Sequence, residues 1–296
     1  MFDFRLKVFT AVAKRLSFTK ASEEMNISQP AVSKHIRELE NELKSKLFDR
    51  KGNKIELTIY GQTLLNYAEK IRNINRDFEF EINQLKNIQK GIFKIGCSTT
   101  IANFILPKIL AKFNFNYPDI KIELTVNNSE KIAELLEKNE IDCGLTEGLS
   151  VSTLLDYYPF MKDELVLVTS NKSMFNKDII SRNELRSYKF VNRENGSGTQ
   201  EIIKDALKKY GLNYSDLNST IQLGSNESIK NYILNSDAVG FVSVHTILAE
   251  LQNNQLAIID IEDLIINRNF YFVTSKGNQS SIVNLFQKFI TNNLKL

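Results

Sequence analysis

The sequence has little cysteine and little histidine. Cys97, Cys143, His35 and His245 are the only ones, and no Cys-x-x-Cys motif occurs. Two cysteines cannot form a disulfide framework, and each lies in an apolar, strand-like stretch, so we expect buried thiols, with redox sensing as the alternative. So small a supply of histidine and thiolate ligands argues against a zinc or iron site. We therefore expect neither a metal nor a bound cofactor.

Long apolar runs are also missing. The longest, such as Leu165 to Val168 and Val239 to Val242, are far shorter than the ~20 residues that a membrane-spanning helix needs. The first residues show no basic region followed by an apolar segment and a small-residue cleavage site. We expect a protein that stays in the cytoplasm and has no membrane partner.

What is present is enough for a folded core and about two domains. The chain has 296 residues, of which 42% are hydrophobic and 25% are charged. Residues 1 to 90 carry 17 Lys and Arg against 12 Asp and Glu (+5), and the remaining residues carry 21 against 23 (−2). A basic N-terminal module joined to a slightly acidic larger one is typical of a nucleic-acid reader attached to a second function.

Two short helices with capping residues are predicted near the N-terminus. Ser17 can cap a helix that runs to about Met25, and Ser28 can cap the next helix, whose first turn tolerates Pro30. Asn26-Ile27 suits the tight turn between the helices. This is the pattern of a helix-turn-helix.

One face of the second helix is apolar, and the opposite face is free to contact DNA. Val32, Ile36 and Leu39 are spaced to pack on the first helix near Ala21. Gln29 lies at the exposed N-terminal end, which a recognition helix presents to the major groove, where Gln can bond adenine bidentately. The candidate DNA contacts on this helix are Ser28, Gln29, Pro30, Ser33, Lys34 and Arg37.

A small hairpin follows. Gly52-Asn53 stands between Phe48 and the alternating Ile55 and Leu57, a pattern that predicts a two-stranded wing. The candidate phosphate contacts on the wing are Arg50, Lys51 and Lys54. Each basic residue alone could simply belong to a solvated face, but capped helices, turn and wing together indicate DNA binding.

Residues 58 to 89 predict one long helix, because they contain no proline and only one glycine, Gly61. Apolar residues recur every seven positions in two series, Leu64, Ile71, Phe78 and Leu85, and Tyr67, Ile74 and Ile88. Such an a/d seam predicts pairing with a second helix, although Glu81 interrupts it. The alternative is a helix that lies on its own domain.

From about residue 91 onward, strand-like runs alternate with helical ones, which indicates an α/β domain. The predicted strands are Ile92 to Cys97, Ile120 to Asn127, Asp142 to Thr146, Glu164 to Thr169, Lys189 to Asn192, Thr220 to Leu223, Ala238 to Ser243, Leu256 to Ile259 and Phe270 to Thr274. The predicted helices are Ile101 to Phe115, Glu130 to Lys138, Thr199 to Tyr210, Ser225 to Leu234 and Ser280 to Asn293.

The stretch from Phe9 to Gly61 closely resembles the LysR-type transcriptional regulators. The residues that carry the resemblance are Ser17-Phe18-Thr19, Ala21, Ser28-Gln29-Pro30-Ala31-Val32-Ser33, Ile36, Leu39-Glu40, Leu47-Phe48-Asp49-Arg50, Leu57-Thr58 and Gly61. The resemblance implies an α+β protein with a winged helix-turn-helix (1–60), a dimerising linker helix (61–90) and an effector domain like a type 2 periplasmic binding protein (91–296).

The resemblance also implies partners. It predicts binding to double-stranded promoter DNA, a homodimer through the linker helix, assembly into a homotetramer, and contact with RNA polymerase. The effector domain should have two lobes, with lobe I at about 91–161 and 269–296 and lobe II at about 162–268. The chain should cross between them near Phe160 to Asp163 and near Ile266 to Phe270.

Two Ser/Thr clusters stand where strands give way to helices, at 98–100 and at 197–199. Hydroxyls beside helix N-termini make plausible anion cradles, although the same residues could merely cap their helices. In the LysR-type family the matching segments line the effector pocket. The residues implied are Ser98, Thr99, Thr100, Ser197, Gly198 and Thr199, with Asn127, Thr146 and Glu147 as weaker candidates on the rim.

The effector-domain motifs look most like the branch of the family that controls sulfur assimilation or carbon fixation, which suggests a small anionic metabolite. Three other functions fit the sequence less well. An enzyme with Cys143 or Ser98 as nucleophile has no paired base. A transporter's solute-binding protein would not carry the DNA-binding module, and a DNA binder without ligand response would not need both Ser/Thr clusters.

Overall fold

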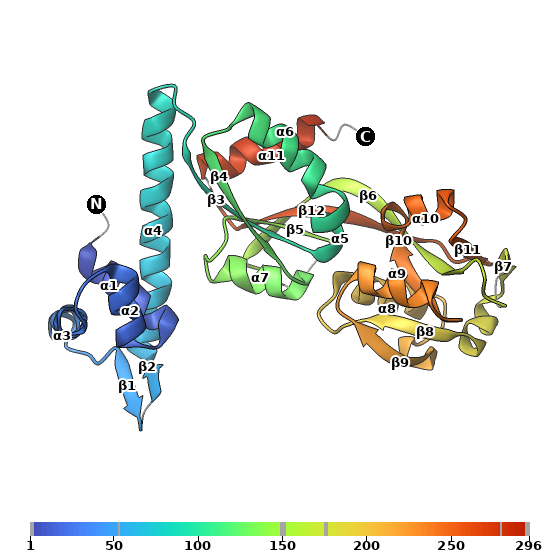
Figure 1. The fold of residues 1–296 in the computed structure, drawn as a ribbon, viewed down its shortest axis with the longest axis horizontal. Helices are drawn as coiled ribbons and strands as arrows, with labels where there is room; N and C mark the ends of the chain where they lie inside the picture. Colours follow the sequence, from blue (N-terminus) through green and yellow to red (C-terminus); the bar gives the residue numbers. More distant parts are fainter. Residues whose placement is uncertain (1–2, 53, 149–151, 175–176, 279, 294–296) are drawn as a thin grey trace. The chain divides into compact units, whose positions relative to one another are not determined.

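The computed structural model describes residues 3–52, 54–148, 152–174, 177–278 and 280–293 (Figure 1). The chain divides into two compact units, one made of residues 1–91 with the segment 138–140 and the other of the remaining residues. Within the ranges described, no helix combines the length and the apolar character needed to span a bilayer.

The first unit is a helix-turn-helix followed by a wing and a long helix. Its elements are α1 (Phe4–Arg15), α2 (Phe18–Met25), α3 (Gln29–Leu43), β1 (Phe48–Lys51), β2 (Lys54–Leu57) and α4 (Ile59–Leu85). Ser17 and Ser28 cap α2 and α3 as predicted, their Oγ atoms accepting from the backbone N–H groups three residues on, at 3.3 and 3.4 Å. The side chains of Val32, Ile36 and Leu39 are buried in the core of this unit.

The start of α4 is held tightly against the helix-turn-helix. Thr58 caps α4 by accepting from the Gly61 N–H at 3.0 Å, and its hydroxyl donates to the Lys46 carbonyl at 2.6 Å. A Cβ added at Gly61 would lie 2.1 Å from the Leu47 carbonyl oxygen, so only glycine fits at this approach.

The apolar stripe of α4 is largely exposed in the single chain. Leu64 packs against the core of the first unit. In contrast, the side chains of Ile71, Ile74, Phe78 and Leu85 are between 43% and 81% exposed. The helix-turn-helix therefore covers only the beginning of the stripe.

The second unit is a two-lobed α/β domain built on one mixed sheet (Figure 1). Its strands are β3 (Gly91–Cys97), β4 (Ile120–Val126), β5 (Cys143–Thr146), β6 (Leu155–Ser170), β7 (Ile179–Ile180), β8 (Lys189–Arg193), β9 (Asn218–Leu223), β10 (Val239–Ser243), β11 (Leu256–Ile261) and β12 (Ile266–Ser275). Its α-helices are α5 (Thr99–Phe104), α6 (Leu106–Asn116), α7 (Ser129–Glu137), α8 (Gly198–Lys209), α9 (Asn226–Leu234), α10 (Leu248–Gln252) and α11 (Ser281–Asn293).

The strands run in the order β4-β3-β5-β12-β6-β10-β8-β9, with β11 also paired to β6. We call β3, β4 and β5 with α5, α6, α7 and α11 lobe I, and β7 to β11 with α8, α9 and α10 lobe II. The long antiparallel strands β6 and β12 run through both lobes. The predicted crossing points pair with each other in this register, Asp163 opposite Arg268.

Alternating side chains of β6 supply two separate cores in lobe II. Leu165 and Leu167 pack on the α8 side, while Val168 packs on the α9 side. In lobe I, α6 and α11 cover one face of the sheet through contacts among Phe113, Phe286 and Phe93. Helix α7 covers the other face (Figure 1).

Three of the predicted elements of the effector domain differ from the structure by more than two residues or are divided. One is β12, which begins at Ile266 and not at Phe270. The predicted helix from Ile101 to Phe115 is broken at Ile105 into α5 and α6, because Pro107 lacks the N–H that a continuous helix would need there. The strand predicted to begin at Glu164 begins at Leu155 and includes Pro159, at the side of an irregularity in its pairing with β12.

Candidate DNA-binding surface and effector site

The N-terminal half of α3 presents the predicted DNA contacts to solvent. Gln29, Pro30, Lys34 and Arg37 are exposed, and Ser33 is half-buried. The Gln29 amide donates to Ser33 Oγ at 3.1 Å, one turn further along α3. The exposed side chains of Pro30, Lys34 and Arg37 lie on the face of α3 opposite its buried core residues, as the sequence predicted.

The wing is a four-residue antiparallel pairing with the turn at its tip. Phe48 pairs with Leu57, and Lys51 pairs with Lys54. Gly52 has a φ of 62°, which glycine adopts without strain in such a turn. Lys54 is exposed. The side chains of Arg50 and Lys51 lie outside the described part of the chain.

In the effector domain, Glu147 is the centre of a buried network of hydrogen bonds. It lies just after β5 and is 1% exposed. One carboxylate oxygen accepts from the Thr100 backbone N–H at 3.1 Å, and the other accepts from the Thr199 hydroxyl at 2.6 Å. A residue predicted only for the rim thus joins the two Ser/Thr clusters.

Two buried guanidinium groups balance the charge of Glu147. Arg268 on β12 donates to Asp163 at 2.6 Å and to the Thr199 hydroxyl at 2.8 Å, and its Nη1 lies 3.4 Å from Glu147. Burial alone would raise the pKa of Glu147, but the positive charges of Arg268 and Arg193 and its hydrogen bonds lower it to about 2. Glu147 is therefore an ionised buried carboxylate.

Arg193, at the end of β8, holds the other side of the network. It donates to the Thr99 hydroxyl at 3.3 Å, to Asn226 at 3.2 Å and to Glu194 at 2.8 Å. Asn226 in turn donates to the Thr100 hydroxyl at 2.6 Å. Thr99 and Thr100 of lobe I are therefore bound to lobe II.

Four members of this network are not predicted from the sequence, namely Asp163, Arg193, Asn226 and Arg268. One signal exists for Asp163 and Arg268, because opposite charges stand in the two segments predicted to cross between the lobes. Arg193 lies four residues before the second Ser/Thr cluster, but this position in the sequence does not indicate which residues it contacts. No sequence pattern singles out Asn226.

Ser98 and Ser197 stand at the N-caps of α5 and α8, yet neither side chain makes a capping hydrogen bond. Both hydroxyl oxygens are buried and without a hydrogen-bond partner, as are Ser129 Oγ and Arg268 Nη2. The capping role that the sequence left open for Ser98 and Ser197 therefore does not account for their hydroxyl groups. Buried donors left unpaired cost free energy and call for an explanation.

The remaining predicted effector residues differ in their surroundings. Thr146 is buried and donates to the Gly148 carbonyl at 3.0 Å. Gly198 is buried, and a Cβ there would lie 2.7 Å from Ser129 Oγ. Asn127 is exposed, and its side chain accepts only from the neighbouring Asn128 N–H, so it does not join the network.

A cavity of about 840 Å³ opens at this place, with Ser129, Gly198 and Arg268 in its wall. The start of β12 and one face of α8 form most of the wall, together with Glu130, Gly148 and Gly196. Other charged side chains lining it are Glu130, Glu201, Asp205 and Lys209. Ser129 Oγ and Arg268 Nη2, both buried and without a hydrogen-bond partner, belong to residues of this wall.

Neither cysteine is placed for chemistry. Cys97 and Cys143 are completely buried, and burial raises the pKa of both thiols well above the usual value. Their thiolate forms are disfavoured, as expected of structural thiols.

The chain combines an exposed recognition helix, a wing and a long helix with a two-lobed domain that contains unpaired donors. This combination defines a DNA-binding regulator with a ligand-binding domain. Residues 4–62 match the family model of the bacterial regulatory helix-turn-helix protein, lysR family, and residues 86–295 match that of the LysR substrate binding domain. The chain belongs to the LysR family of transcription regulators and is not an enzyme.

Two relatives align over nearly the whole chain. The RuBisCO operon transcriptional regulator of Allochromatium vinosum is 30% identical over 288 residues, 97% of this chain and 94% of that protein. The HTH-type transcriptional regulator CysL of Bacillus subtilis is 31% identical over 271 residues, 91% of this chain and 90% of that protein. Both belong to the branch of the family that the effector-domain motifs predicted.

Among solved structures, the regulatory domain of Synechocystis CcmR in complex with 2-PG superimposes with a TM-score of 0.63 and 28% identity. The match covers 69% of this chain and 97% of that domain. The predicted fold class, a winged helix-turn-helix and a two-lobed α/β domain in one α+β protein, is confirmed.

Proposed function

We propose that this regulator binds promoter DNA through α3 and the wing, and responds to a small anionic metabolite held between the lobes of its effector domain. In the DNA-binding part, Gln29 and Ser33 contact base edges, with Ser28 and Pro30 at the same end of α3. Lys34, Arg37, Arg50, Lys51 and Lys54 contact phosphates or flanking bases.

The observation that carries the effector proposal is the pair of buried, unpartnered hydroxyls at the starts of α5 and α8. Ser98 belongs to lobe I and Ser197 to lobe II, and neither side chain serves as a cap. An oxyanion bound between the lobes would accept from both hydroxyls and from the free N–H of Arg268. We assign Thr99, Thr100, Thr146, Glu147, Gly198 and Thr199 to the surroundings of this site, with Asn127 at its rim; of these, Gly198 lines the cavity of about 840 Å³.

The Glu147 carboxylate would compete with a bound anion for the hydrogen-bond donors of this site. Its carboxylate already accepts the Thr100 N–H and the Thr199 hydroxyl. An arriving anion would compete for these donors and for Arg268, which links Glu147 to β12. Ligand binding would thus rearrange the contact between the lobes, and the complex of the relative CcmR with 2-PG supports a small-molecule ligand for such a domain.

Assembly completes the proposal. The exposed stripe on α4 pairs two chains, and two such dimers form a homotetramer whose DNA-binding units span one promoter. The effector favours one geometry of this assembly and so shifts its population, which alters the DNA contacts and the contact with RNA polymerase.

The test is to capture fragments of the source genome with the purified protein, with and without a panel of small anions. We expect enrichment of one interrupted palindrome, with a pattern that shifts in the presence of one anion. Enrichment that no anion changes would favour a DNA binder without ligand response, and no enrichment would contradict sequence-specific regulation.

Ser98→Ala and Ser197→Ala sharpen this test. Each substitution removes an unpaired buried hydroxyl, so the free protein should keep or slightly gain stability. The shift caused by the anion should disappear, while the palindrome is still enriched. Ser225→Ala is the matched control, because Ser225 forms a true helix cap in the same domain, so its loss should lower stability and leave the anion response unchanged.

A further inference from the structure

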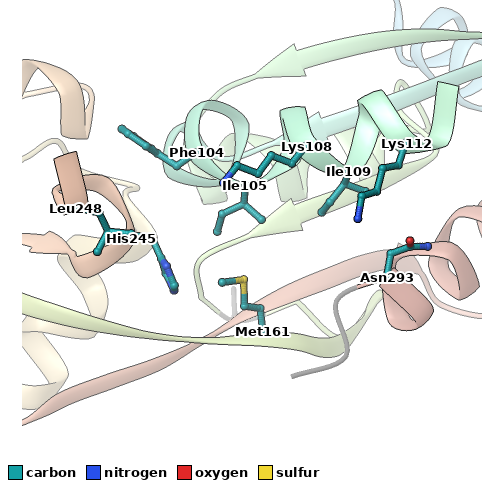
Figure 2. A pocket seen from close by; sticks show the side chains of 9 residues that line it. All are labelled: Phe104, Ile105, Lys108, Ile109, Lys112, Met161, His245, Leu248 and Asn293. Atoms are coloured by element: carbon teal, nitrogen blue, oxygen red, sulfur yellow. The ribbon is translucent and has the colours of Figure 1, made fainter. Parts of the chain in front are cut away.

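A second cavity, separate from the donors described above, opens in the effector domain. Its volume is about 300 Å³, and Figure 2 shows the nine side chains that line it. Lobe I contributes residues from α5, α6 and α11, and β6 contributes Met161. Lobe II contributes His245, from the 3₁₀ turn Val244–Thr246, and Leu248 from α10. The cavity is therefore formed by both lobes.

One face of α6 forms much of the wall. Lys108, Ile109 and Lys112 are spaced at adjacent helical turns and share that face, and Ile105 stands at the N-cap of α6. Ile105 and Ile109 are buried, and Met161 and Phe104 are half-buried. In Figure 2 the side chains of Ile105 and Ile109 extend from the helix towards Met161. This part of the cavity is apolar.

The rim is cationic. Lys108 and Lys112 are exposed, and within the described ranges neither has a carboxylate oxygen within 4 Å. Other lysines of this domain do, for example Lys121 with Glu123 and Lys204 with Glu201, each at 2.9 or 2.8 Å. None of the nine lining residues is acidic. The two ammonium groups are therefore available to a ligand.

The charged groups behind the cavity wall are paired with one another. His245 Nε2 lies 3.8 Å from Asp163, which also accepts from Arg268 at 2.6 Å. On the other side, Lys230 lies over the Phe104 ring and pairs with Glu227 and Glu250 at 2.8 Å each. Among the residues that line the cavity, Lys108 and Lys112 are the permanently charged ones.

We propose that this cavity is a second ligand site, which binds a small monocarboxylate with a compact apolar body. The apolar body lies against Ile105, Ile109 and Met161, and the carboxylate lies between Lys108, Lys112 and the His245 imidazole. The volume is about twice that of a cavity that holds benzene, so it accepts a ligand of roughly ten non-hydrogen atoms. Its apolar floor distinguishes it from the polar site around Glu147.

The test uses 4-fluorophenylacetate as the probe and its uncharged amide, 4-fluorophenylacetamide, as the matched control compound. Binding to the full-length protein is followed by ¹⁹F NMR line broadening. We expect the carboxylate to bind, and the amide to bind roughly tenfold more weakly because it cannot pair with the two lysines. Equal binding of the two compounds, or no broadening by the carboxylate at millimolar concentration, would overturn the proposal.

Variants locate the probe. The double variant Lys108→Gln/Lys112→Gln should weaken binding roughly three- to tenfold, since both side chains are exposed and each ion pair in water is weak. Leu248→Glu, at a position that is 51% exposed, adds a carboxylate at the rim and should weaken binding further. The double variant Lys172→Gln/Lys208→Gln removes the same charge elsewhere on lobe II and should bind like the original protein.

Two further outcomes bear on the proposal. Ser197→Ala, which alters the site between the Ser/Thr clusters, should leave probe binding unchanged, so this proposal and the proposed effector site can fail independently. The variants Lys108→Gln/Lys112→Gln and Leu248→Glu should also keep the mass of the assembly, measured by light scattering. A smaller assembly in both would instead assign the cavity to a contact between copies of the chain.

Discussion

Glu147 is an ionised carboxylate that the fold places entirely inside the effector domain. The charged form of Glu147 is stabilised by Arg268, by Arg193 and by the hydroxyl and N–H groups that donate hydrogen bonds to it. Removing one partner of such a buried arrangement is costly, because the other charges stay buried without compensation.

We therefore expect Glu147→Gln to lower the free energy of unfolding by about 3 kcal/mol at neutral pH. The pKa of Glu147 is about 2 in the folded protein and 4.5 in its ordinary state. Because the folded-state pKa is the lower one, the stabilisation is complete above about pH 4.5 and is lost as the pH falls from there towards 2.

Urea unfolding of the original protein and of Glu147→Gln at several pH values between 7 and 3 measures this effect. The difference in unfolding free energy between the two proteins should shrink as the pH falls. Taking this difference removes the contribution of all other carboxylates, because they titrate in both proteins. Glu262→Gln, an exposed position in the same domain, is the control and should show almost no difference at any pH. A constant difference for Glu147→Gln would contradict an ionised buried carboxylate.

At the scale of residues, local roles could be predicted from the sequence and distant partners could not. Ser17 and Ser28 cap helices that begin beside them, so their roles need only a few neighbouring residues. Glu147 meets Thr199 and Arg268 at separations of 52 and 121 residues. Such partners are decided by the pairing of β6 with β12 and by the packing of the two lobes, which no local pattern encodes.

At the scale of elements, α4 exposes large apolar side chains along one face. Ile74 is 67% exposed and Phe78 is 50% exposed in the single chain. Exposed side chains of this size, repeated along one helix face, gain roughly 1.5 to 3 kcal/mol each when they are buried against a partner.

We expect Ile74→Glu to reduce the molar mass of the assembly in light scattering and to leave the helical content unchanged. The new charge would lie in the seam of the paired helices, where it costs free energy, but it would be solvated in the single chain. Asn66→Glu adds the same charge at an exposed position outside the seam and should keep the original mass. Equal masses for the original protein and Ile74→Glu would contradict pairing through this stripe.

The sequence predicted most elements, because strand and helix periodicity and capping residues are local signals. It predicted one helix over 101–115 where Pro107 divides two, although proline is itself a local signal. It predicted only the second half of β6, since the first half includes Pro159 and several half-exposed polar residues. That half is a strand because β12 pairs with it along its length.

At the scale of the whole molecule, charge is divided unevenly, with the excess of positive charge in the first 90 residues. Affinity for DNA that comes from phosphate contacts falls steeply with salt, because each contact releases counterions. The effector domain, with its slight negative excess, should contribute little to this dependence.

We expect Lys34→Ala and Lys54→Ala each to flatten the plot of log affinity against log salt concentration. The slope should fall by roughly 0.9 for every phosphate that the lysine no longer neutralises, and so by about twice that in a dimer. Fluorescence anisotropy with a labelled operator fragment at roughly 50 to 200 mM salt measures the slope. Lys121→Ala, on β4 of the effector domain, should leave the slope unchanged. If one of the two substitutions also leaves it unchanged, that lysine does not bind a phosphate.

The pairing of β6 with β12 limits how the lobes can move. Their register holds from Ile266 opposite Leu165 to Ser275 opposite Leu155, with one irregularity beside Phe270. A slip by one residue would turn every side chain to the opposite face, so the strands cannot slide past each other. The ribbon can only twist and bend. In the proposed mechanism, a bound effector would therefore change the angle between the lobes while their separation along the ribbon stays constant, and we expect the signal to be a rotation.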